Sequence, residues 1–130
     1  MITLLRNTRR PDISFYRNGR IDITARTAKL IGIKDGDVID IAVDNGEYYV
    51  YVRHKAECVI GRHEAQCYRT NRRSVICNNL RAHSIRLCAM ILSIHNDANA
   101  VRLPVGEPQQ HAELGCVLPI IVRNNIKKYD

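Results

Sequence analysis

The sequence has no tryptophan and a single phenylalanine, Phe15, so that aromatic residues make up only 5% of its 130 residues. A hydrophobic core must therefore consist mainly of Ile, Val, Leu and Ala. The longest nearly uncharged apolar run, residues 87–94, is far shorter than the ~20 residues of a membrane span. The first residues do not resemble a signal peptide. We therefore expect a soluble, cytoplasmic protein with no membrane partner, folded as one domain or two very small ones.

Sequence signatures of catalysis and of metal binding are also missing. There is no Cys-x-x-Cys pair and no glycine-rich phosphate loop, and the five histidines are scattered. The spacing of Cys58, His63 and Cys67 matches no common zinc site. We therefore expect free thiols, no metal, no cofactor and no catalytic residues, so the protein is not predicted to be an enzyme.

Acidic residues are few relative to basic ones, 13 against 20, and the net charge is +7. Residues 1–29 contain seven bases and two acids, and residues 61–90 contain six bases and one acid, so each block carries +5. Residues 30–60 carry −3 instead. Arginine dominates both blocks, and its planar guanidinium suits phosphate oxygens and guanine edges. The blocks indicate a nucleic-acid partner, although a solvated basic surface would have the same composition.

The first half of the chain shows a clear pattern of short elements. Alternating apolar residues predict strands, Asn-Gly pairs predict hairpin turns, and Thr24 and Gly32 are suited to begin and end a helix. The expected elements are a strand at 13–17, a type I′ turn at 18–19, a strand at 20–23, a helix at 25–31, a turn at 34–37, a strand at 38–43, a turn at 44–46 and a strand at 47–53.

The second half repeats this pattern weakly, because residues 68–72 resemble residues 16–20 at an offset of 52. With one inserted residue, the strand at 38–41 aligns with 91–94, which predicts a strand there and a hairpin turn at 96–99. After residue 104 we expect a loop and then one edge strand at 117–122, because it contains Pro119. The predicted parts are a basic N-terminal arm at 1–12, a first hairpin copy at 13–53, a linker at 54–66, a degenerate second copy at 67–104 and a C-terminal extension at 105–130.

Two stretches, residues 19–23 (Gly-Arg-Ile-Asp-Ile) and 31–41 (Ile-Gly-Ile-Lys-Asp-Gly-Asp and a strand), resemble the AbrB/MazE-like swapped-hairpin family. The resemblance covers about residues 13–53, with a degenerate second copy at about 66–104. It implies a DNA-binding fold in which two copies interlock their hairpins, and members act as transcriptional regulators or antitoxins. Arg20 and Lys29 match basic positions of the family, whereas Ala28 and Thr24 depart from its pattern.

Together these patterns predict a β-rich α+β fold, a small barrel-like swapped-hairpin domain with two fused copies as an intramolecular pseudo-dimer. The expected function is binding of double-stranded DNA, as a transcriptional regulator or antitoxin. The alternative is a protein-interaction or assembly subunit that keeps the fold without binding DNA, and self-association is also open. Both arginine blocks on one face would favour DNA, and opposite faces would favour the alternative. The candidate nucleic-acid-binding residues are Arg9, Arg10, Arg17, Arg20, Arg26, Lys29, Arg69, Arg72, Arg73 and Arg81.

Overall fold

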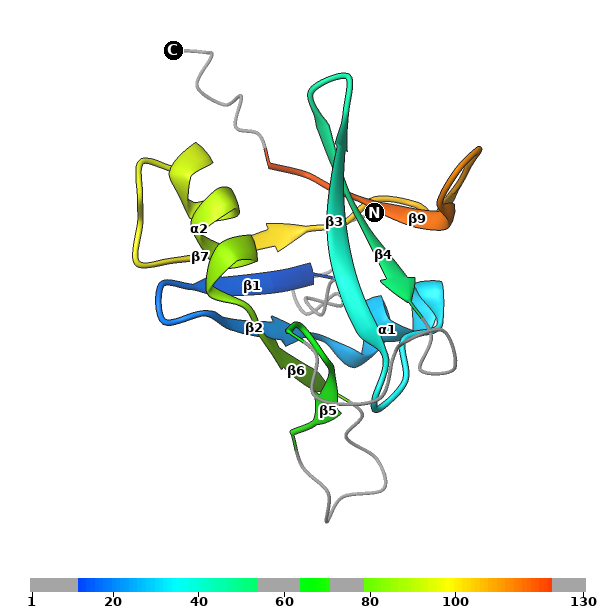
Figure 1. Cartoon of the computed structure of the whole chain (residues 1–130), viewed down its shortest axis with the longest axis horizontal. Coiled ribbons are helices and arrows are strands. Elements are labelled where there is room, and N and C mark those ends of the chain that lie inside the picture. The colour runs from blue at the N-terminus through cyan, green and yellow to red at the C-terminus, as the bar shows by residue number, and fades with distance from the viewer. Residues whose placement is uncertain (1–11, 54–63, 71–78, 123–130) are drawn as a thin grey trace, which may run out of the picture.

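The computed structural model describes residues 12–53, 64–70 and 79–122, which form two antiparallel sheets and two helices (Figure 1). The elements in chain order are β1 (Asp12–Tyr16), β2 (Arg20–Ile23), α1 (Ala25–Ile31), β3 (Val38–Asp44), β4 (Glu47–Arg53), β5 (Tyr68–Arg69), β6 (Leu80–His83), α2 (Ile85–Ile94), β7 (Ala100–Pro104), β8 (Gln109–His111) and β9 (Gly115–Ile120).

In the first half, the predicted order of strands, helix and hairpin is confirmed. The Thr24 hydroxyl accepts a hydrogen bond from the backbone N–H of Thr27 and so caps the start of α1. Gly32 ends the helix with φ 75°, the left-handed conformation that glycine adopts without steric cost. Asn45 and Gly46 both have positive φ, as a two-residue type I′ turn between β3 and β4 requires.

The turn between β1 and β2 is different from the predicted type I′ turn. Three residues connect the strands, and only Gly19 has positive φ, at 98°. Glycine is required here by a distant segment: a Cβ on Gly19 would lie 2.8 Å from His83 Cε1 and 2.9 Å from Ile85 Cγ1. The carbonyl of Gly19 also accepts a hydrogen bond from Ser84 N at 2.8 Å. The turn is therefore shaped by the segment that joins β6 to α2.

The predicted strand at 91–94 is wrong, because these residues form the end of α2. The Ser84 hydroxyl accepts from Leu87 N at 3.1 Å and begins the helix, which buries Ile91 and Leu92. Residues 96–99 consequently join α2 to β7 and do not form a hairpin turn. The alignment of the two halves therefore pairs β3 with the end of α2, that is, a strand with a helix. A short apolar run is compatible with either structure, and the cap at Ser84 favours the helix.

Both sheets are open, so the expected barrel is not closed. The strand orders are β5-β6-β2-β1-β7 and β3-β4-β9-β8. In the five-stranded sheet, β6 pairs with β2 and β7 pairs with β1, so strands from the two halves of the chain lie side by side. Figure 1 shows β3 and β4 running steeply across the direction of β1 and β2. The molecule is thus a small β-rich α+β domain, and its swapped-hairpin identity stays a prediction.

Two expectations for the C-terminal part are also wrong. Residues 109–111, expected in a loop, form β8, so this part contains two strands. β9 is not an edge strand, because it lies between β4 and β8. Pro119 is tolerated inside the sheet because the pairing with β8 stops at Val117. Its missing N–H therefore costs no hydrogen bond to β8.

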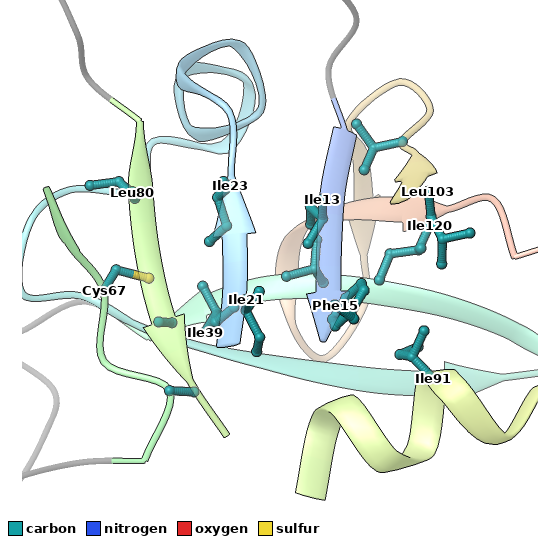
Figure 2. Packing of buried hydrophobic residues seen from close by; sticks show 14 of the residues in the cluster. Ile13, Phe15, Ile21, Ile23, Ile39, Cys67, Leu80, Ile91, Leu103 and Ile120 are labelled. Carbon is teal, nitrogen blue, oxygen red and sulfur yellow. The ribbon is translucent and has the colours of Figure 1, made fainter. Parts of the chain in front are cut away.

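The hydrophobic core lies between the sheets and is shared by both halves of the chain. Figure 2 shows Ile21 of β2, Leu80 of β6 and Ile91 of α2 directed toward one interior. Phe15 is also buried there, and the other members are mostly aliphatic, as the composition predicts. No helix within the described ranges is both long enough and apolar enough to cross a membrane.

Candidate nucleic-acid interface

The outer face of the five-stranded sheet is polar and arginine-rich. Because Ile21, Leu80 and Leu103 point into the core, the alternate residues of their strands point outward. Cross-strand pairing aligns five of these outward residues in one row, one from each strand. The row, from β7 to β5, is Arg102, Ser14, Asp22, Arg81 and Tyr68. We use the name arginine face for this row together with Asp12, Tyr16, Arg20 and His83.

Asp22 occupies the centre of the arginine face and contacts two arginines. Its Oδ1 accepts a hydrogen bond from Nε of Arg81 at 2.7 Å, and its Oδ2 lies 3.3 Å from Nε of Arg20. The hydrogen bond to the Asp22 carboxylate raises the pKa of Arg81, because the carboxylate stabilises the guanidinium cation. Arg20 and Arg81 belong to the two different basic blocks, so one carboxylate brings the blocks together.

An aromatic ring and a second carboxylate hold the other arginines of the face. The Arg20 guanidinium lies over the ring of Tyr16, 4.0 Å from its centroid, which is a cation–π contact. Arg102 donates from Nε to the Asp12 carboxylate at 2.8 Å. The side chain of Asp12 is only 8% exposed, whereas that of Arg102 is 68% exposed. A buried acid therefore anchors an arginine that extends into solvent.

The terminal nitrogens of these arginines are available for a ligand. Among the residues that the structure describes, none accepts a hydrogen bond from a terminal nitrogen of Arg20, Arg81 or Arg102. Their Nε atoms face carboxylates, which limits the rotation of each guanidinium. A guanidinium held in this way can donate two parallel hydrogen bonds to a phosphate group.

Of the predicted residues that the structure describes, only Arg20 and Arg81 lie on the arginine face. Arg17 has a structural role, because it donates from Nε to Asn99 Oδ1 at 2.8 Å and from a terminal nitrogen to the carbonyl of Asp97. These bonds tie the β1–β2 turn to the loop after α2. Arg69 pairs with the buried Leu80 and so lies on the core side of its strand.

The remaining predicted residues lie elsewhere or are not described. Arg26 and Lys29 are exposed on α1 and are not part of the sheet. Arg9, Arg10, Arg72 and Arg73 lie outside the described residues.

Sequence reasoning missed seven residues of the arginine face, namely Asp12, Ser14, Tyr16, Asp22, Tyr68, His83 and Arg102. A signal existed for Arg102, because Val101 and Leu103 flank it in a strand and alternation then turns Arg102 outward. No local signal shows that β7 pairs with β1 or that β5 pairs with β6. These pairings bring Arg102 and Tyr68 to the face, whereas Tyr16 lies on the predicted hairpin partner of β2 and His83 lies on the same strand as Arg81.

A groove of about 670 Å³ lies beside the arginine face, at the β5–β6 edge. Its lining includes the acids Asp35 and Glu64 together with Tyr68, His83 and Ile85, and Ile85 is 61% exposed. Within the described residues, His, Cys, Asp and Glu side chains form no group of three able to hold a metal ion. The groove combines two carboxylates with an exposed apolar side chain, and it shares Tyr68 and His83 with the arginine face.

Cys67 also lines this groove, but its thiol is not a nucleophile at neutral pH. Burial and then the nearby carboxylates of Asp37 and Asp35 raise the pKa of Cys67 to about 12. Cys67 and Cys88 are buried free thiols, and Cys116 is an exposed one.

No family model matches the chain, and no curated protein and no solved structure matches it either. The resemblance to the AbrB/MazE-like family therefore rests on the residues quoted above, and the geometry of the arginine face is the basis for a functional proposal.

Proposed function

We propose that the protein binds DNA through the arginine face. The observation that carries the proposal is the shared carboxylate of Asp22, which holds Arg20 and Arg81 side by side on neighbouring strands. The two basic blocks thus contribute to one surface, which is the arrangement expected for a nucleic-acid ligand. Arg102 extends the surface across the sheet to β7.

Electrostatics support a polyanion as the ligand. The net charge of +7 attracts DNA over a distance, and the three arginines provide local contacts with phosphate oxygens. Asp12 and Asp22 reduce the local charge, but they also orient the guanidinium groups. We therefore expect binding of moderate strength that depends strongly on salt. Double-stranded DNA and a role as regulator or antitoxin, both expected from the sequence, stay predictions.

The test is fluorescence anisotropy of labelled DNA at a series of salt concentrations, with the wild-type protein and the double variant Arg20→Gln/Arg81→Gln. Loss of two phosphate contacts should make the slope of log K against log salt shallower by about 2 for duplex DNA and slightly less for a single strand. The matched control is Arg86→Gln. Arg86 lies on α2, which packs against the core side of the sheet, and its side chain is 85% exposed. An unchanged slope in the double variant, or no binding at low salt, would refute the proposal.

A protein partner is the second candidate, and the groove at the β5–β6 edge favours it. Glu64 is already paired with Arg86 at 2.6 Å, and the exposed Ile85 beside it suits an apolar side chain of another protein. The function would then be that of an interaction or assembly subunit. This candidate would be selected by two results together: no DNA binding at low salt, and a purified partner protein that binds the wild type but no longer binds the Ile85→Ser variant.

A further inference from the structure

We infer that the arginine face takes single-stranded DNA in preference to a duplex. This inference rests on the proposed function and specifies the form of its ligand. It is carried by three features of the described residues: the width of the sheet, the aromatic side chains beside its arginines, and the partners of its carboxylates.

The width of the sheet does not match a DNA groove. Five hydrogen-bonded strands at a spacing of about 4.8 Å span roughly 20 Å. The major groove is about 12 Å wide, which admits a helix or a two-stranded ribbon. The whole face therefore cannot enter the groove, and the base edges of a duplex stay out of its reach. A single strand can lie flat across the face and contact several strands of the sheet.

The face carries two flat surfaces on which an unpaired base can stack. One is the Arg20 guanidinium, which lies 4.0 Å from the centroid of the Tyr16 ring in a side chain that is 37% exposed. The other is Tyr68, which is 43% exposed at the end of the central row. Bases of single strands stack on aromatic rings and on guanidinium planes, whereas bases inside a duplex are already stacked on each other.

Arg81 lies between these two surfaces. β6 is between β2, which carries Arg20, and β5, which carries Tyr68. The order across the sheet is thus a stacking surface, a guanidinium whose Nε is bonded to Asp22, and a second stacking surface. This order matches a base, a phosphate and the next base of an extended strand.

The carboxylates of the face indicate DNA as the source of the strand. A carboxylate that accepts a hydrogen bond from the ribose 2′-hydroxyl would favour RNA, and both carboxylates of the face are already paired with arginines. Asp22 contacts Arg20 and Arg81, and Asp12 contacts Arg102. Neither carboxylate is therefore placed to favour RNA through the 2′-hydroxyl.

The experiment measures anisotropy of labelled oligo(dT), of a duplex of the same length and of oligo(U), at one low salt concentration. We expect oligo(dT) to bind about tenfold more tightly than the duplex, and oligo(U) to bind no more tightly than oligo(dT). Tyr68→Leu should weaken oligo(dT) binding about tenfold and leave duplex binding unchanged. The control is Tyr49→Leu in the other sheet, where the phenol donates to Glu47 at 3.0 Å.

The outcomes separate this inference from the proposed function. Equal or tighter binding of the duplex overturns the single-strand inference and leaves DNA binding intact. An unchanged affinity of Tyr68→Leu for oligo(dT), with circular dichroism showing a folded variant, overturns the stacking role. Much tighter binding of oligo(U) overturns DNA as the source. Failure of every oligonucleotide to bind overturns both proposals.

Discussion

Replacing Leu118 with alanine tests whether the C-terminal strands belong to the core of this protein. Leu118 lies in β9, pairs with Val50 of β4 and is 0% exposed, as is Val50. The sequence pattern places residues 105–130 in a C-terminal extension with one strand at the edge of a sheet. In the structure, the same side chain is fully buried in the hydrophobic core to which both sheets contribute, so its removal leaves a cavity.

The expected magnitude follows from this burial. Truncation of a buried leucine to alanine costs about 2–5 kcal/mol, and less where the surroundings can collapse into the cavity. Leu118 is in an internal strand with paired neighbours on β4, which restricts collapse, so we expect a loss of about 3 kcal/mol. With a urea m-value of about 1.5 kcal/mol/M, the unfolding midpoint should fall by about 2 M.

The assay is equilibrium urea unfolding followed by far-ultraviolet circular dichroism. Cys116→Ser is the matched control, because Cys116 is exposed in the same strand and its substitution should change the free energy of unfolding by less than about 0.5 kcal/mol. A loss below about 1 kcal/mol for Leu118→Ala would refute the shared core. A second unfolding transition would likewise indicate that β9 belongs to a separate unit.

Three further predictions concern a turn, a thiol and a carboxylate. Gly19→Ala should destabilise the fold by about 1–3 kcal/mol, because an alanine there combines positive φ with two close contacts. Gly46→Ala, with positive φ but no atom within 4 Å of its Cβ, should cost less in the same urea assay, and equal losses would contradict the contact argument. Iodoacetamide should label Cys116 well before Cys67 in the folded protein, as peptide mapping would show, because the pKa of Cys67 is about 12 and its side chain is buried. Hydrogen bonds from Arg86 and Ser84, at the start of α2, lower the pKa of Glu64. The ionised Glu64 carboxylate therefore stabilises the fold above the ordinary carboxyl pKa, and this stabilisation is lost as pH falls through the lowered pKa. The urea midpoint of Glu64→Gln should consequently fall less than that of the wild type between about pH 5 and pH 3.

Local structure in the first half of the chain could be predicted because its causes are local. Thr24 caps α1 through its own side chain, Gly32 ends it, and Asn45-Gly46 sets the β3–β4 turn. These effects act within a few residues, so a pattern in the sequence is sufficient. The prediction was wrong at residues 91–94, where the same apolar run suits a strand or a helix.

The sequence by itself determined the alternation of Arg20 and Asp22 with Ile21 and Ile23, and hence that these polar residues lie together on one side of β2. It also determined that arginine occurs in two blocks. Only the tertiary structure decided which strands are neighbours. Antiparallel pairing of β2 with β6 places Arg81 opposite Asp22, although 59 positions separate them in the chain. Pairing across such a separation depends on the burial of apolar residues from distant segments in a common core, and no local spacing encodes that choice.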